Sequence, residues 1–120
     1  MVASDRWVIE AYRTPAGACP VQDFIQSLTG QDEVDAFALV KLIQERGNRV
    51  REPQSKALSK GLYELRRNQV RIFYVFGPGR RVVTLLSGIV KKRDRIPQGS
   101  LETARTYKAA VEVRGKRSKR

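Results

Sequence analysis

The chain has 120 residues, 41% hydrophobic and 30% charged, which is typical of a single globular domain that buries a core without disulfides or metals. Its 24 Lys and Arg residues outnumber its 12 Asp and Glu residues, so the net charge is +12. The absence of His, the single cysteine at Cys19 and the lack of a long apolar run exclude a His-dependent catalytic triad, an internal disulfide, nearly all zinc sites and a membrane-spanning helix.

The first half of the chain predicts one strand followed by two helices. Residues 7–12 are rich in β-forming side chains and end at a turn that contains Pro and Gly, which favours a strand. Pro20 begins a helix that runs to about Thr29, with its apolar residues on one face. A second helix begins near Asp32 and ends at Gly47, and its apolar stripe suits packing on a sheet.

The second half predicts three strands close together and a closing helix. The strands cover residues 62–66, 70–76 and 82–90, and short polar or Pro-Gly turns separate them. Residues 97–113 have the apolar spacing of a helix. Residues 114–120 carry five basic residues and no apolar one, so we expect a disordered tail that adds only general attraction to polyanions.

This element order, β-α-α-β-β-β-α, predicts an α+β fold. We expect an antiparallel sheet packed against the two N-terminal helices and the C-terminal helix, in one domain over residues 1–113.

All of the excess positive charge lies in the second half. Residues 1–60 carry eight basic and eight acidic residues, whereas residues 61–120 carry sixteen and four. Such a field attracts polyanions, and nucleic acid is the first candidate. The lone cysteine fits a reducing compartment and no signal peptide is recognisable, so we expect a cytoplasmic protein without a membrane partner.

Two arginines face each other across the predicted hairpin. With Asn68 and Gln69 as its two loop residues, Arg66 lies opposite Arg71 on the same face, with Cβ atoms about 5 Å apart. Only Glu64, two residues away on that face, offsets their repulsion locally. A bound phosphate that bridges the guanidinium groups would stabilise the pair. The alternative is that both side chains point into water.

A basic run, Lys91-Lys92-Arg93, follows the last strand at a point close to this pair. The alternative interpretation of the run is a solvated loop. Without His, clustered cations supply RNA-cleaving chemistry, because a lysine whose pKa is lowered by neighbouring charge acts as base while arginines neutralise the developing charge. No pair of carboxylates suggests magnesium, so we expect neither a metal nor another cofactor. Tyr63, Tyr74 and Trp7 are interpreted as core or sheet-face aromatics rather than stacking platforms.

Three segments, 58–66, 71–74 and 85–92, resemble the RelE/HigB toxin family in order and spacing. They are closest to the phage-related HigB-like branch of the RelE/ParE superfamily, with its Leu-Tyr-Glu-Leu-Arg, Arg-aliphatic-Phe-Tyr and Gly-Phe-x-Lys-Lys pattern. The chain departs from that branch at Ile89, where Phe is usual, and at Ser87, where His or Thr is common.

The resemblance implies the toxin of a type II toxin–antitoxin pair, a metal-independent mRNA endoribonuclease (mRNA interferase) of a kind that mostly acts on messages in the ribosomal A site. Its partner would be a helix-turn-helix antitoxin that covers the basic face. The expected catalytic residues are Arg66, Arg71, Lys91 and Lys92, and the expected RNA contacts are Lys60, Arg67, Tyr74, Arg93 and Arg95.

Two alternatives keep the same fold without catalysis. One is a ParE-like toxin that inhibits DNA gyrase by binding, or a protein whose basic face only docks on nucleic acid. The other is a degenerate toxin retained as a binding partner.

Overall fold

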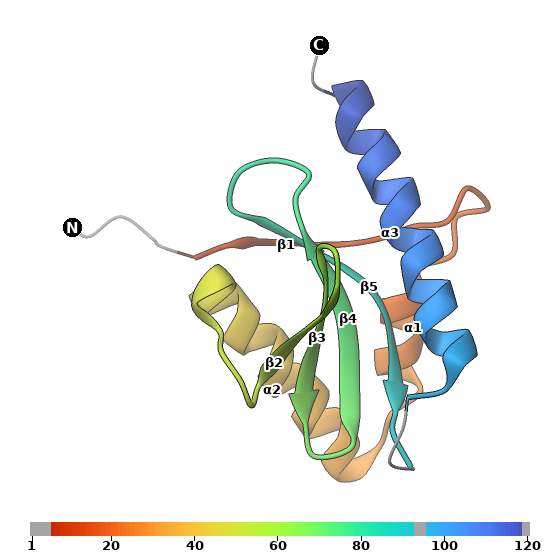
Figure 1. The fold of residues 1–120 in the computed structure, drawn as a ribbon. Coiled ribbons are helices and arrows are strands. Elements are labelled where there is room, and N and C mark those ends of the chain that lie inside the picture. The colour runs from red at the N-terminus through yellow and green to blue at the C-terminus, as the bar shows by residue number, and fades with distance from the viewer. Residues whose placement is uncertain (1–5, 93–95, 119–120) are drawn as a thin grey trace.

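The computed structural model of the chain describes residues 6–92 and 96–118, and it confirms the α+β class. The strands are β1 (Val8–Ala11), β2 (Ser55–Ser59), β3 (Leu62–Arg67), β4 (Val70–Phe76) and β5 (Val82–Val90), and the helices are α1 (Pro20–Gln26), α2 (Gly30–Arg46), the short 3-10 turn η1 (Gly47–Arg49) and α3 (Gln98–Ser118). The five strands form one sheet in the order β1-β5-β4-β3-β2 (Figure 1).

Two features of the sheet differ from the prediction. β1 pairs with β5 in parallel, so the sheet is mixed rather than antiparallel; the two helices between β1 and the later strands allow the chain to return in the same direction. The strand β2 was not predicted. It is an edge strand of mostly polar, exposed residues. Its composition is that of a loop, and its strand conformation depends on its pairing with β3.

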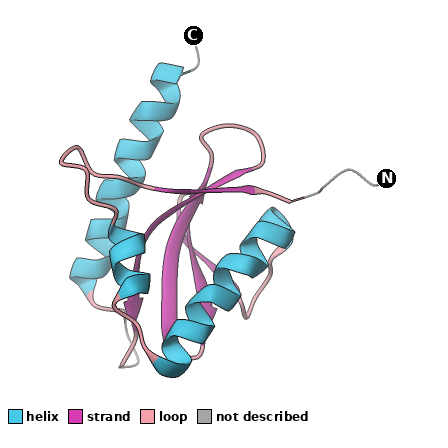
Figure 2. Cartoon of the chain, turned by 180° about the vertical axis from the view of Figure 1, so that it is seen from behind, coloured by secondary structure: helices cyan, strands magenta, loops and turns pink. Residues whose placement is uncertain are grey.

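The helices cover the two faces of the sheet. α1 and α2 lie across one face (Figure 2), and α3 packs on the other. Because side chains alternate along a strand, each strand contributes to both layers. The core under α1 and α2 includes Val21, Ala36, Leu39, Ile43, Leu65, Ile72 and Tyr74, and the core under α3 includes Leu62, Phe73, Leu86, Ala104 and Val111. Within the described ranges no helix has the length and apolarity needed to cross a membrane.

The closing helix is longer than predicted. α3 continues to Ser118, so the expectation of a disordered tail from residue 114 is wrong for residues 114–118; residues 119–120 lie outside the described part of the chain. Tertiary contacts explain the extension. The Arg114 guanidinium lies over the Tyr12 ring at 5.7 Å, and Gly115 is buried against Pro78. A composition-based prediction does not contain these contacts.

The close approach of α1 to β5 generates a stability prediction. A Cβ atom added at Gly88 would lie 2.3 Å from Cδ2 of Phe24 and 3.0 Å from the Arg71 carbonyl oxygen. We therefore expect Gly88→Ala to lower the free energy of unfolding by about 1–3 kcal/mol, measured by urea denaturation, because the strand or the ring must shift. Gly99→Ala is the control, since no atom lies within 4 Å of its added Cβ. Equal stabilities of the two variants would contradict this packing.

Candidate functional site

The β3–β4 hairpin places the two arginines as predicted. Arg66 pairs with Arg71 across the two strands, with Asn68 and Gln69 in the turn. The turn lies at one end of the sheet, next to the end of β5 (Figure 1). By alternation, Arg66 and Arg71 share a face with Phe73, which belongs to the core under α3. The pair therefore lies on the α3 side of the sheet.

Arg71 is held in place by the hairpin itself. It is only 7% exposed, and its Nη1 atom donates hydrogen bonds to the carbonyl oxygens of Asn68 (2.7 Å) and Val70 (3.0 Å). Burial lowers the pKa of its guanidinium, and so does the charge of Arg66, whereas the charge of Glu64 raises it. The arginine nevertheless stays charged at neutral pH. These contacts hold the Arg71 guanidinium group in place on the strand opposite Arg66.

Glu64 is the functional candidate that the sequence prediction left out of the site. It lies two residues before Arg66 on the same face of β3 and is 3% exposed. Its Oε1 atom lies 3.5 Å from Nε of Arg66, an ion pair without hydrogen-bond alignment. Burial raises the pKa of Glu64 above its ordinary value of 4.5, and the neighbouring cations Arg71, Arg66, Lys56 and Lys91 counteract that rise. A partly paired, buried carboxylate at this place is suited to proton transfer.

Buried polar atoms without partners concentrate at this place. Among the residues that the structure describes, the buried side-chain atoms that lack a hydrogen bond are Oε2 of Glu64, Nε of Arg66, Nε of Arg71 and Oγ of Ser87. Ser87 lies opposite Phe73 in β5, beside the arginine pair. Since native proteins satisfy most buried polar groups, such a cluster marks a candidate site for a polar ligand or for ordered water.

The two lysines after β5 are placed differently. The backbone N–H of Lys91 donates to the carbonyl oxygen of Gln69 at 2.6 Å, which ties the end of β5 to the hairpin turn, and its charge acts on Glu64. Lys92 is exposed and lies one residue further from the sheet. The structure thus brings together Arg66, Arg71 and Lys91, and adds Glu64 and Lys56 to them.

A buried carboxylate on the opposite face fastens the hairpin to α2. Asp35, which is fully buried, accepts hydrogen bonds from Nε of Arg67 (3.0 Å), from Nδ2 of Asn68 (2.9 Å) and from Nε2 of Gln31 (2.9 Å). The hydrogen bond from Asn68 is the largest cause of the lowered pKa of Asp35. Because Asn68 also holds Arg71 through its carbonyl oxygen, Asp35 indirectly positions that arginine.

Two residues predicted to contact RNA lie on the face of the sheet opposite to the arginine pair. Arg67 points toward α2, where it forms the ion pair with Asp35. Tyr74 is 1% exposed in the core under α1 and α2, where its hydroxyl lies 2.7 Å from Oγ of Ser55. Strand alternation separates both from Arg66 and Arg71. The burial of Tyr74 corrects the expectation that it contacts RNA, whereas the Arg67 side chain is 53% exposed and its contact with RNA stays a prediction.

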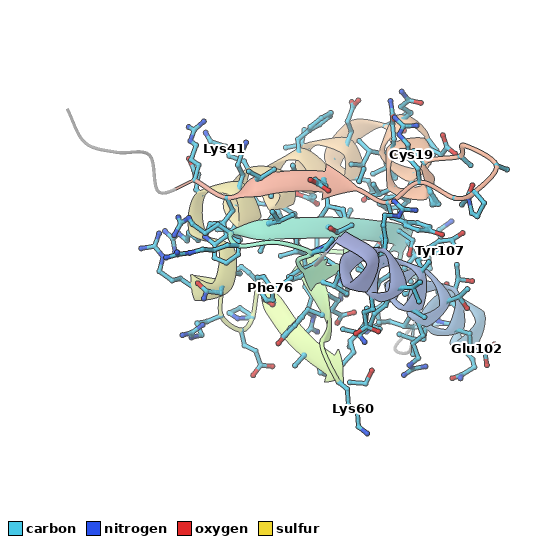
Figure 3. The ribbon with its side chains drawn as sticks, turned by 90° about the horizontal axis from the view of Figure 1, so that it is seen from above. Cys19, Lys41, Lys60, Phe76, Glu102 and Tyr107 are labelled. Carbon is cyan, nitrogen blue, oxygen red and sulfur yellow. The ribbon has the colours of Figure 1, made fainter. Side chains whose placement is uncertain are left out.

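Of the remaining predicted contacts, the structure describes only Lys60. Lys60 is exposed in the β2–β3 turn and points away from the body of the molecule (Figure 3). Lys60 precedes Leu62, the first residue of β3, and Leu62 lies about 13 Å from Arg66 by strand rise. Arg93 and Arg95 lie outside the described residues. Among the described residues, no group of three or more His, Cys, Asp and Glu side chains is arranged to hold a metal ion.

Comparisons with known proteins fit this chain into one family. The model of the family described as "Phage derived protein Gp49-like" matches residues 23–109, from within α1 to within α3. None of the curated proteins matches the chain. Among solved structures, one chain in the crystal structure of the toxin–antitoxin complex RelBE2 from Mycobacterium tuberculosis is similar, with a TM-score of 0.47 and 18% sequence identity; the match covers 73% of this chain and 94% of that chain.

The hydrogen bonds of Asp35 predict a pH-dependent stability. The pKa of Asp35 is lower in the folded chain than its ordinary 3.8, so its contribution is complete above that value and is lost as the pH falls through the folded pKa. We expect Asp35→Asn to lower the melting temperature by roughly 5 °C at pH 7, and the difference from wild type to shrink below about pH 4. Glu33→Gln, on the same helix but exposed, is the control. A difference that is constant with pH would contradict this role.

Proposed function

The chain belongs to the Gp49-like family of phage-derived proteins, and from that premise we propose that it is the toxin of a type II toxin–antitoxin pair. We propose that it cleaves messenger RNA without a metal ion, at the phosphate held between Arg66 and Arg71. The single observation that carries the proposal is the cluster of buried polar atoms without hydrogen bonds on Glu64, Arg66, Arg71 and Ser87.

The arginine pair is suited to a phosphodiester. Arg66 and Arg71 stand directly opposite each other, and the Nε atom of each lacks a hydrogen-bond partner. A phosphate group between them accepts from both guanidinium groups and removes their mutual repulsion. The same contacts strengthen when a pentavalent phosphorane with an additional negative charge forms, which is the condition for lowering the barrier.

Glu64 supplies the base that the sequence prediction sought among the lysines. Its carboxylate takes the proton of the ribose 2′-hydroxyl, the 2′-oxygen bonds to phosphorus, and the bond from phosphorus to the 5′-oxygen breaks. The products are a 2′,3′-cyclic phosphate and a 5′-hydroxyl, whose proton comes from the Lys91 ammonium group. Burial raises the pKa of the Glu64 carboxyl and so brings it closer to neutral pH. A general base is most effective when its pKa lies near the working pH.

The proposed partner is a helix-turn-helix antitoxin, as the resemblance implies. The same basic surface that attracts RNA would be neutralised by such a protein, because Arg66, Lys56 and Lys91 are partly or fully exposed around the pair. Covering this surface would block the phosphate position.

Substitution of the arginines tests the cleavage proposal. We expect induction of the wild-type chain to arrest growth and to cut transcripts at discrete sites, mapped by primer extension. Arg71→Ala and Arg66→Ala should each reduce cleavage at least 100-fold, because each removes a donor to the transition-state charge. Lys41→Ala, an exposed cation on α2, is the control and should cleave as wild type does.

The same induced cells distinguish RNA cleavage from gyrase inhibition. Arg71 is buried, so its variant is first compared with wild type in thermal unfolding; Arg66, with a side chain 31% exposed, provides a second variant less subject to misfolding. Intact transcripts accompanied by altered DNA supercoiling would replace the cleavage proposal with gyrase inhibition.

The role of Glu64 predicts a pH profile. A base acts in its deprotonated form, so the cleavage rate of wild type should rise with pH through a pKa above 4.5 and then level off on that limb. Glu64→Gln should lower the rate about 10²–10⁴-fold and abolish this rise. The measurement is the initial rate of cleavage of a purified RNA between pH 4 and pH 8. An unchanged profile in the variant would assign the base to another group.

A further inference from the structure

A groove lies at the other end of the sheet from the arginine pair. It has a volume of about 660 Å³, within the range of small-molecule binding sites. The β2–β3 turn, the β4–β5 loop and the C-terminal half of α3 surround it, and Phe76 lies in it (Figure 3). Phe76 lies five residue steps along β4 from Arg71, about 17 Å by strand rise.

Three aromatic rings form one wall of this groove. The Phe76 ring is 36% exposed and meets the Trp7 ring at 5.6 Å and the Tyr63 ring at 5.2 Å, edge to face in both cases. Trp7 is fixed from behind, because a Cβ added at Gly47, which has a positive φ of 52°, would lie 2.1 Å from its indole. The rings are thus packed against one another, and Phe76 keeps a partly open face.

Cations surround the rings. Arg80 and Arg81 in the β4–β5 loop are exposed and line the groove, and the Arg81 guanidinium lies over the Trp7 ring at 5.3 Å. On the opposite side, Lys108 of α3 lines the groove and forms an ion pair with Glu112 at 2.8 Å. The lining residues therefore carry three positive charges against one negative charge.

We propose that this groove binds unpaired nucleotides of RNA, with a base stacked on Phe76 and the adjoining phosphates beside Arg80 and Arg81. Every base has a π-face and every linkage a negative charge, so aromatic rings inside a cationic groove suit single-stranded nucleic acid. The charge of the lining favours this ligand over an apolar peptide. The inference takes RNA as its ligand from the proposed function, but it uses a surface separate from the arginine pair.

The lone tryptophan reports binding directly. Because Trp7 is the single Trp of the chain and lines the groove, a base bound there should quench its fluorescence. The probe is a 2′-O-methyl oligouridylate of six nucleotides, which cannot be cleaved through a 2′-hydroxyl. We expect saturable quenching that weakens as salt is raised. An abasic oligomer of the same length should quench far less, since it carries the phosphates without the stacking bases.

Matched variants locate the binding. Phe76→Ala should weaken the oligonucleotide affinity about tenfold, the order expected for loss of one stacked base, and Arg80→Glu should also weaken it. The controls are Phe37→Ala, which removes a ring 56% exposed on α2, and Lys41→Glu on the same helix; neither should change the affinity.

Substitution of the arginine pair tests the groove proposal separately from the cleavage proposal. In the Arg66→Ala, Arg71→Ala double variant, quenching should persist although cleavage is lost. Quenching that disappears in the double variant, equal quenching by the abasic oligomer, or no quenching by a wild-type chain that still cleaves RNA would each overturn the groove proposal. In the last case the cleavage proposal stands. Quenching without cleavage by wild type would support the groove and overturn the cleavage proposal.

Discussion

The repulsion between Arg66 and Arg71 is the constraint around which this end of the molecule is organised. Two guanidinium groups on opposed strands face each other, and the chain compensates for them only in part. Glu64 supplies one buried negative charge, and backbone carbonyl oxygens of the turn accept from Arg71. The Nε atoms of both arginines remain without a hydrogen bond, although that of Arg66 forms the ion pair with Glu64. A structure that keeps buried donors unsatisfied is preorganised for an anion, because the cost of ordering those donors is met before the anion arrives.

A helix on the opposite face of the sheet helps to hold this arrangement. Asp35 of α2 binds both the side chain of Arg67 and that of Asn68, at the tip of the hairpin. The carbonyl oxygen of Asn68 then accepts from Arg71 on the other face. The hairpin turn thus transmits the position of α2 to the arginine pair. A two-residue turn alone fixes the register of the strands, whereas this buried carboxylate also fixes where the turn lies against the helical layer.

The sequence contained most of the fold but only part of the site. Local patterns were sufficient for the three helices and for the Arg66–Arg71 register, because hydrophobic period and turn length are local properties. The same local rule puts Arg67 on the face opposite to the pair, since neighbours on a strand point to opposite faces. Glu64 and Asp35 are different. Their roles depend on burial and on partners up to 33 residues away, which no local pattern contains.

Cations of the second half gather at two ends of one sheet, among them Arg66, Arg71 and Lys91 at one end and Arg80 and Arg81 at the other, and the two ends differ in chemistry. Beside the arginine pair the nearest ring in register, Phe73, is fully buried, so that end offers charge and a carboxylate but no stacking surface from β4. At the other end Phe76 is open and Arg80 lies beside it. Phosphate contacts position a nucleic acid, whereas contacts with the bases distinguish one stretch from another. If both regions bind one RNA, the arginine pair therefore fixes the phosphate to be cleaved, and the aromatic groove is where the chain has the means to contact the bases.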